Sequence, residues 1–379
     1  MIKEKDQSIL IRKISSSDDF CMLRENWNNL LALSPVDNYF LRWEWLWNWW
    51  EIYKQRDFEL SILLVFREDD LIGIGPFYLH HRSYKKIYSV RRLMFLGTKE
   101  MSVISEYMDI IYREAEEHLV TRKVMEFIAE ENVCDDIYLQ KMDASSRTIP
   151  ILKQVAFQRK WHVNGYEEIE SPYISLPADW NDFMEKCSSS MRYKIKRDRR
   201  KLMSYPEVMI RKTRDTGELE MDFKDLVRLH QQRWEVRNQP GSFSCVEFHL
   251  FQKTIMNDML QNGFLQLWFL SVGSRNIAAV YNILYRNKIY FYQSGLDTSF
   301  ERQFSPGLLL HSYCIENSIR EGLSEYDFML MGDLDGYKRR WTKECRYLCD
   351  LYVARPQIMK VLSIVRDTLE SVYATIRQK

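Results

Sequence analysis

The 379-residue sequence has no excess charge of either sign and no long apolar run, and these absences exclude several classes of protein. Its 54 basic residues nearly equal its 53 acidic ones, so no whole-protein field favours nucleic acid or an anionic membrane. The N-terminus lacks the apolar core of a signal peptide, and no later segment approaches the length of a membrane span. We therefore expect a cytoplasmic protein with no transmembrane segment and no DNA partner.

Patterns that bind metals or activate a nucleophile are also missing. The seven cysteines are scattered, and although Cys345 and Cys349 are close together, no second pair completes a zinc motif. His80 and His81 are paired without a carboxylate at metal-ligand spacing, so we expect them to be structural or at the surface. No Ser/His/Asp order or nucleophile elbow is visible. The sequence thus predicts reduced thiols and no metal.

The length and the order of predicted elements indicate two α/β domains with mixed sheets. A chain of this length suits two domains of ordinary size, and 46% of its residues are hydrophobic, enough for substantial cores. Predicted strands and helices alternate, and Pro172 and Pro177 interrupt the pattern near the middle. We place the boundary there, with an N-terminal domain over 1–170 and a C-terminal domain over 171–379.

Three predicted helices bear on the interpretation. The tryptophan-rich segment 38–54 has one apolar face, which we expect to lie in the core rather than to bind a ligand. A basic helix is predicted over 180–203, ending before Pro206. The C-terminal helix over 357–378 is amphipathic, and we expect it to pack on the body of the protein, with a membrane-surface role as the alternative.

The stretch 288–341 organises the second domain. It starts with an aromatic strand, KIYFYQSGL, and the helix that follows opens at Ser305-Pro306-Gly307 and closes on Gly322. Gly307 lets a ligand approach the backbone, and the free N–H groups of the first turn make a natural anion site. A short strand, EYDFMLMG, comes next. This strand–helix–strand unit predicts a site for a phosphorylated cofactor, and an ordinary capped helix is the alternative.

The ordered motifs of this stretch resemble a known family. SGLDTSF, SPGLLL, IREGLSEYDF and GDLDGYKRRW are similar to the C-terminal half of the CelD-like cellulose-biosynthesis acetyltransferases. That family belongs to the GNAT superfamily of acyl-CoA-dependent N-acetyltransferases and is related to the Fem-like peptidyltransferases. Upstream, NYFLRWEWLWNWW, LIGIGPFYL, RRLMFLG and SEYMDI extend the resemblance over most of residues 20–355. It implies two tandem GNAT-like domains around a shared cleft, with the N-terminal one on the acceptor side.

The resemblance implies acetyl-CoA or another acyl-CoA as the acyl donor. GNAT enzymes hold the CoA pyrophosphate on backbone N–H groups at a comparable helix start, although the loop here has a single glycine. They also offer strand backbone to the pantetheine arm, where a bulge or a strand end is the alternative interpretation. The implied cofactor-binding residues are Gln293, Ser294, Gly295, Gln303, Ser305, Gly307 and Leu308.

The segment around Lys338 matches the YK-x-x-W element of the family and implies the catalytic residues. Lys338 would stabilise an oxyanion or hold an acceptor phosphate, and Tyr337 would return a proton to the leaving thiolate. Asp333 would act as a base for an acceptor amine or orient Lys338. The alternative is a solvated basic turn anchored by Trp341.

Two groups of residues are candidates for binding the acceptor. The basic run 192–201 is either a solvated face or a clamp for phosphate on a nucleotide-linked or lipid-linked sugar, on CoA or, in the Fem-like case, on tRNA. In the first half, the family's S-x-Y-x-D-like strand implies an acceptor groove, although its aspartate is equally credible as a structural hydrogen-bonding group. The candidates are Arg192, Lys196, Arg199, Glu106, Tyr107, Asp109 and Trp341.

Three functions remain open from sequence. The resemblance favours an N-acyltransferase that moves an acetyl or acyl group from acyl-CoA to an amino group, expected on an amino sugar or a cell-envelope polysaccharide precursor. The first alternative is a Fem-like transfer of an amino acid from charged tRNA. The second is a non-catalytic GNAT-like binding module.

Overall fold

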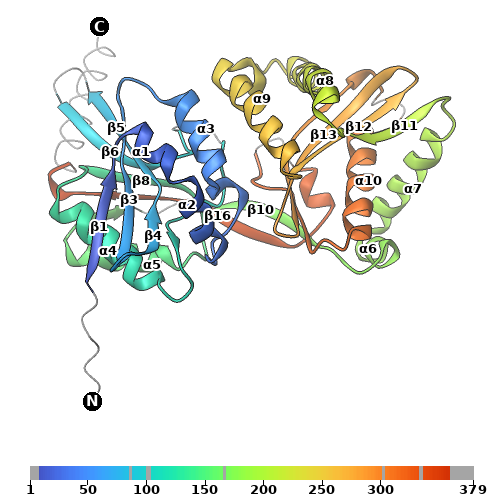
Figure 1. Cartoon of the computed structure of the whole chain (residues 1–379). Helices are drawn as coiled ribbons and strands as arrows, with labels where there is room; N and C mark the ends of the chain where they lie inside the picture. The colour runs from blue at the N-terminus through green and yellow to red at the C-terminus, as the bar shows by residue number, and fades with distance from the viewer. Residues whose placement is uncertain are drawn as a thin grey trace, which may run out of the picture. The chain divides into compact units, whose positions relative to one another are not determined.

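The computed structural model describes residues 8–84, 88–99, 104–164, 168–300, 304–332 and 336–358, and these form a mixed α/β fold, as expected (Figure 1). The chain divides into two compact units. The second unit is Ile169–Arg346, and the first consists of the chain up to Glu168 together with the chain from Tyr347 on. The helix expected over 357–378 lies almost entirely outside the described residues. No helix of the described part of the chain is long and apolar enough to cross a membrane.

The first unit has two sheets. One has the strand order β1-β3-β4-β7, and the other runs β16-β8-β6-β5-β2, with β9 paired to β16. The strands are β1 (Ile9–Ile14), β2 (Phe58–Leu60), β3 (Ile62–Arg67), β4 (Asp70–Gly75), β5 (Phe77–Tyr84), β6 (Tyr88–Phe95), β7 (Ile111–Tyr112), β8 (Asp136–Asp143), β9 (His162–Asn164) and β16 (Cys345–Ala354). The helices are α1 (Ser17–Met22), α2 (Arg24–Ala32), α3 (Trp43–Tyr53), α4 (Glu117–Glu130) and α5 (Thr148–Gln158). The tryptophan-rich helix α3 is core, as expected, because Trp45 and Trp49 are fully enclosed.

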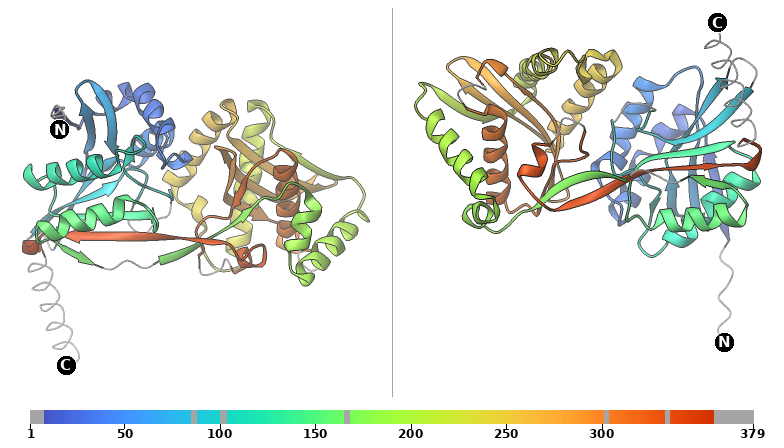
Figure 2. Two further views of the ribbon diagram at one scale, coloured as in Figure 1. Left: turned by 90° about the horizontal axis from the view of Figure 1, so that it is seen from below. Right: turned by 180° about the vertical axis from the view of Figure 1, so that it is seen from behind.

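The second unit is built on one sheet with helices on both faces. Its strand order is β11-β12-β13-β14-β15-β10. The strands are β10 (Glu168–Ser175), β11 (Val208–Lys212), β12 (Leu265–Val272), β13 (Arg275–Tyr285), β14 (Lys288–Leu296) and β15 (Glu325–Asp327). Helices α8 (Thr216–Glu235) and α9 (Val246–Gln261) cover one face, and α10 (Pro306–Arg320) covers the other, with α6 (Trp180–Lys186) and α7 (Ser189–Leu202) packed against α10 (Figures 1 and 2).

Strands β14 and β15 pair over a short distance and then separate. They are parallel, and their register joins Lys288–Tyr290 to Glu325–Asp327 only. β14 continues for six more residues, and its pairing with β13 shifts register between Tyr281 and Asn282, which marks a β-bulge. From Phe291 onward, therefore, this edge of β14 has no β15 residue opposite it within the described part of the chain.

Gly295 lies where α8 packs directly on β14. A Cβ atom built on Gly295 would lie 2.4 Å from the backbone nitrogen of His230 and 2.6 Å from the carbonyl carbon of Leu229. Because these are backbone atoms, they cannot yield by a side-chain rotation. The glycine expected to admit a ligand thus has a packing reason to be glycine.

Replacing Gly295 by alanine should lower the free energy of unfolding by about 1–3 kcal/mol, the usual cost of overpacking a core. Urea unfolding of Gly295→Ala and of Gly336→Ala would measure it. Gly336 is the control, because a Cβ built there has no atom within 4 Å. Equal stability of the two variants would show that α8 can move away from β14 at no cost.

Candidate functional site

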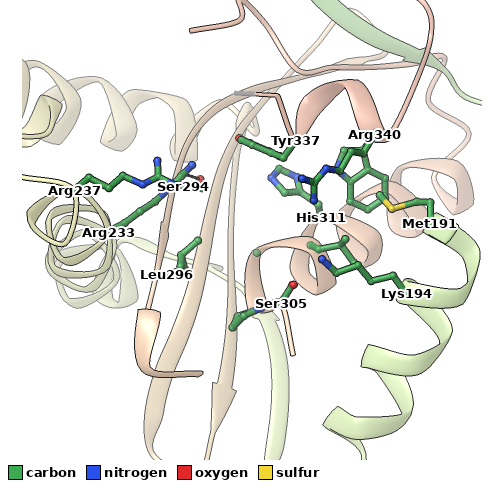
Figure 3. A pocket seen from close by; sticks show the side chains of 14 residues that line it. Met191, Lys194, Arg233, Arg237, Ser294, Leu296, Ser305, His311, Tyr337 and Arg340 are labelled. Atoms are coloured by element: carbon green, nitrogen blue, oxygen red, sulfur yellow. Dashed lines mark hydrogen bonds between the residues drawn. The ribbon is translucent and has the colours of Figure 1, made fainter. Parts of the chain in front are cut away.

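A cavity of about 190 Å³ lies in the second unit beside the first turns of α10 (Figure 3). Its lining comes from α7, from the C-terminal end of α8, from β14, from α10 and from the segment around η4 (Lys338–Arg340). The lining residues are Met191, Lys194, Arg233, Arg237, Ser294, Leu296, Ser305, Pro306, Gly307, Leu308, His311, Tyr337, Arg340 and Trp341. We call this cavity the helix-start pocket.

The start of α10 supplies backbone donors to the helix-start pocket. Ser305 is the N-cap residue and Pro306 the first helical residue, as expected, but the Ser305 side chain caps no N–H group. The N–H of Ser305 itself is satisfied by the buried carboxylate of Asp198 at 3.1 Å. The N–H groups of Gly307 and Leu308 have no acceptor within the described chain, which is usual for the first turn of a helix. Free N–H groups at a helix start favour a bound anion, so an anion site here stays a prediction.

The side chains around the pocket give it a positive charge. Lys194, Arg237 and Arg340 line it and form no ion pair or side-chain hydrogen bond with any described residue. Arg233 donates to the Ser294 hydroxyl at 3.0 Å and lies over the Tyr337 ring at 5.7 Å. No acidic residue appears in the lining. The pocket is therefore suited to an anion that brings its own negative charges.

His311 is a candidate residue that the sequence analysis did not single out. It is 3% exposed, and its Nδ1 lies 3.0 Å from the Tyr326 hydroxyl, which donates to Asn282 Oδ1 at 3.3 Å. With the Tyr326 hydroxyl donating to Asn282, the tautomer that fits this network carries its proton on Nδ1 and leaves Nε2 as an acceptor. The one sequence signal for it was its spacing of four residues from Gly307, which places both on one helix face.

The imidazole of His311 is held neutral. Burial, followed by the charges of Arg233 and Lys338, lowers the pKa of His311 to about 3. The ring packs edge-on against Phe291, with the ring centres 4.4 Å apart, and Trp341 lies on another side. Figure 3 shows His311 between Tyr337 and Arg340. The site therefore contains an uncharged hydrogen-bond acceptor among cations.

Of the residues expected to be catalytic, Tyr337 lines the pocket and Lys338 does not, and Trp341, expected to bind the acceptor, also lines it. The ammonium of Lys338 donates to the backbone oxygen of Leu330 at 2.6 Å, and the residue is 6% exposed. Its position anchors the chain after β15 and does not line the helix-start pocket. Asp333 lies outside the described residues.

The three residues of the basic helix that were expected to bind the acceptor do not share one site. Arg192 donates to the carbonyl oxygens of Glu185 and Cys187, at 3.0 and 2.7 Å, and so satisfies the end of α6. Arg199 bonds Glu316 at 2.8 Å and lies between the Trp180 and Tyr313 rings, 4.7 and 4.2 Å from their centres. Lys196 is exposed and lines neither this pocket nor another described cavity.

Four of the seven residues expected to bind the cofactor lie together in one pocket. Ser294, Ser305, Gly307 and Leu308 line the helix-start pocket. The Gln293 side chain is hydrogen-bonded to His230 instead. Gln303 lies outside the described residues.

The expected acceptor residues Glu106, Tyr107 and Asp109 belong to the first unit, whereas the pocket is lined by the second alone. Glu106 and Asp109 are buried, and Tyr107 has a positive φ of 56°. Asp109 accepts a hydrogen bond from Ser146 at 2.5 Å, and burial raises the pKa of Asp109 to about 6. These contacts agree with the structural alternative for Asp109. Within the described residues, no group of three His, Cys, Asp or Glu side chains could hold a metal.

The neutral state of His311 predicts a pH dependence of stability. An exposed histidine titrates near 6.5, so below that pH the unfolded chain binds a proton that the folded chain does not, and stability falls. From pH 7 to pH 5 the wild type should lose about 2 kcal/mol more free energy of unfolding than His311→Gln. Urea unfolding at both pH values measures this difference. Parallel losses in the two proteins would mean that the pKa of His311 is the same in the folded and the unfolded chain.

Comparisons with known proteins agree with this architecture. Residues 189–339 match the family model described as an acetyltransferase (GNAT) domain. A search of curated proteins found no match. Among solved structures, FemX has a TM-score of 0.61 at 10% identity, covering 93% of this chain and 99% of its own.

Two further structures share the fold. A conserved protein of unknown function from Bacteroides thetaiotaomicron has a TM-score of 0.55 at 12% identity, covering 92% of this chain and 99% of its own. The C-terminal domain of a putative lysylphosphatidylglycerol synthetase from Agrobacterium fabrum has a TM-score of 0.51 at 9% identity, covering 93% and 97%. None of these matches names the CelD-like family, which stays a prediction. Residues 189–339 of the second unit thus resemble a GNAT-type acetyltransferase domain, and the chain shares its fold with FemX.

Proposed function

We propose that the protein is a cytoplasmic N-acyltransferase that uses acetyl-CoA or another acyl-CoA and acylates an amino group of a small molecule. The observation that carries the proposal is the separation of β14 from β15 beside the free N–H groups of α10. That arrangement offers an unpaired strand edge to an amide-containing chain and a helix start to a pyrophosphate. The GNAT domain match to the same residues supports it.

The chain's own groups fit such a donor. The N–H groups of Gly307 and Leu308 would hold the pyrophosphate, with Lys194 contributing charge, and the β14 edge near Ser294 would hold the pantetheine arm. Acyl-CoA would supply the acyl group as an activated thioester. The residues that must be close for this, from α7, β14 and α10, already line one pocket.

Two groups in the pocket can take part in the transfer. The Nε2 atom of His311 can accept a hydrogen bond from the attacking amine and orient it, while the amine's proton passes to solvent because the pKa of His311, about 3, is too low for it to act as the base. The hydroxyl of Tyr337, also at the pocket, would return a proton to the leaving thiolate. Lys338 would act at a distance, by holding Leu330 and the chain after β15 in place. The acceptor we expect is an amino sugar or a cell-envelope polysaccharide precursor.

Transfer of an amino acid from charged tRNA is the rival, because FemX shares the fold. The structure gives it less support, since Arg192 and Arg199 make internal contacts and are not available as a surface clamp. Tight, salt-sensitive binding of tRNA together with no binding of acyl-CoA would favour that rival. A stable fold that binds neither would favour a binding module.

Calorimetric titration with acetyl-CoA and free CoA tests the proposal. Gly307→Val should weaken binding at least tenfold, about 1.4 kcal/mol, because the added side chain covers the second N–H position of α10. A Cβ there already lies 3.3 Å from Leu296 Cδ2, so little room remains. Gly217→Val is the matched control, since Gly217 is the second residue of α8 and lines no described cavity. No binding of either ligand by the wild type at millimolar concentration would overturn the proposal.

A further inference from the structure

Two arginines of the helix-start pocket have no part in the proposed binding of the donor. Arg233 lies in the last turn of α8, and Arg237 follows the end of that helix. In Figure 3 they lie with Ser294 on one side of the pocket, and Lys194 lies on the opposite side. We call Arg233 and Arg237 the arginine wall. The donor phosphates are assigned to the start of α10 and to Lys194, so the arginine wall is available to a second ligand.

Arg233 is a half-buried cation without a carboxylate partner in the described part of the chain. Its Nη1 donates to the Ser294 hydroxyl at 3.0 Å, and its central carbon lies 5.7 Å from the centre of the Tyr337 ring. A guanidinium has five N–H donors, so most of those of Arg233 remain for a ligand. Carboxylates and phosphates fit such donors two at a time.

The pocket offers an amine no negative charge of its own. Among the described residues that line it, none is acidic, whereas Lys194, Arg233, Arg237 and Arg340 are cationic. A protonated amine would therefore be repelled on entering, with no carboxylate nearby to offset the repulsion. Polyamines and the lysine side chains of peptides, which bring further positive charge or no negative charge, are poor ligands for such a pocket.

The same cations favour the reactive form of an amine once it is bound. Burial and then the charges of Arg233 and Lys338 lower the pKa of His311, so both cations act at this point of the pocket. Arg233 and His311 also approach the same ring, because the centres of the His311 and Tyr337 rings are 6.4 Å apart. An amine at Nε2 of His311 would be held in its neutral, nucleophilic form by these charges. What the pocket needs is an acceptor whose own negative group compensates them.

We propose that the acceptor is an acidic amine, a small molecule with a carboxylate or a phosphate close to the amino group that is acylated, and that Arg233 binds this acidic group. The inference rests on the proposed function and names its substrate class. Arg237, exposed and without an ion pair among the described residues, adds positive charge on the same side. Among amino sugars the class contains amino-uronic acids and amino sugar phosphates, and it excludes neutral hexosamines.

Three amino sugars that differ only in the group at one carbon test the inference. They are D-glucosamine, which has a hydroxymethyl group there, D-glucosamine 6-phosphate and the carboxylate D-glucosaminuronic acid. Each is titrated calorimetrically into protein saturated with CoA, so that the donor phosphates already occupy their own site. One of the acidic sugars should bind about tenfold more tightly than D-glucosamine, or better, because it gains charge-assisted hydrogen bonds from Arg233. The tighter of the two identifies the acidic group as phosphate or carboxylate.

Variants of Arg233 show whether this residue causes the preference, taken as the ratio of the two affinities within each protein. Arg233→Gln should bring the ratio close to one, since glutamine can still donate to Ser294 but carries no charge. Arg233→Lys should reduce the ratio without abolishing it, because lysine keeps the charge and lacks the planar fork. The matched control is Arg228→Gln, which changes an arginine of the same helix that pairs with Asp225 and does not line the pocket. It should keep the wild-type ratio, and melting temperatures check that each variant is folded.

Several results would overturn the inference while leaving the proposed function standing. They are binding of D-glucosamine as tight as that of both acidic sugars, a wild-type ratio in Arg233→Gln or in Arg233→Lys, and a CoA complex that binds none of the three sugars. Failure of the wild type to bind CoA in the first place would instead remove the proposed function.

Discussion

The three-residue pairing between β14 and β15 is the constraint on which the second unit depends. A parallel strand pair that ends early leaves backbone groups that need partners, and here the gap opens beside the start of α10. The pairing is secured from the far side of β15, where Arg346 bonds Glu325 and Asp327 at 2.7–2.8 Å. The opening is thus held by charged contacts away from the pocket, and Lys194, Arg237 and Arg340 of the pocket form no ion pair with a described residue.

Local sequence signals were sufficient for the elements around this opening. Pro306 after a serine predicted where α10 begins, and Gly322, with a φ of +70°, lies just past its end. The alternation of aromatic and β-branched residues predicted β14, and the tryptophans of α3 are core because so large an apolar face has to be buried. These predictions depend only on neighbours along the chain, and they hold for that reason.

Predictions that depended on tertiary partners could not be made from sequence. The local sequence does not predict that Lys338 donates to the Leu330 carbonyl or that Arg199 lies between two aromatic rings. Nor does it predict that Gly295 packs against the backbone of α8. A single histidine in an apolar helix is normally core, and no local pattern distinguishes His311 from that case. The role proposed for His311 depends on a hydrogen-bond chain through Tyr326 on β15 and Asn282 on β13. That chain engages Nδ1 of the ring and leaves Nε2 without a partner among the described residues. Side-chain direction is decided by such long-range contacts.

The contacts between α7 and α10 have a consequence for the entropy of binding. Asp198 accepts a hydrogen bond from the backbone N–H of Ser305, and Arg199, one residue further, donates to both Ser312 and Glu316. Adjacent residues of α7 thus hold the N-cap and the second and third turns of α10. Lys194 is carried on the same short helix. The α7 side of the helix-start pocket is therefore held by contacts within the protein, and a ligand that binds there would lose little affinity to ordering the protein.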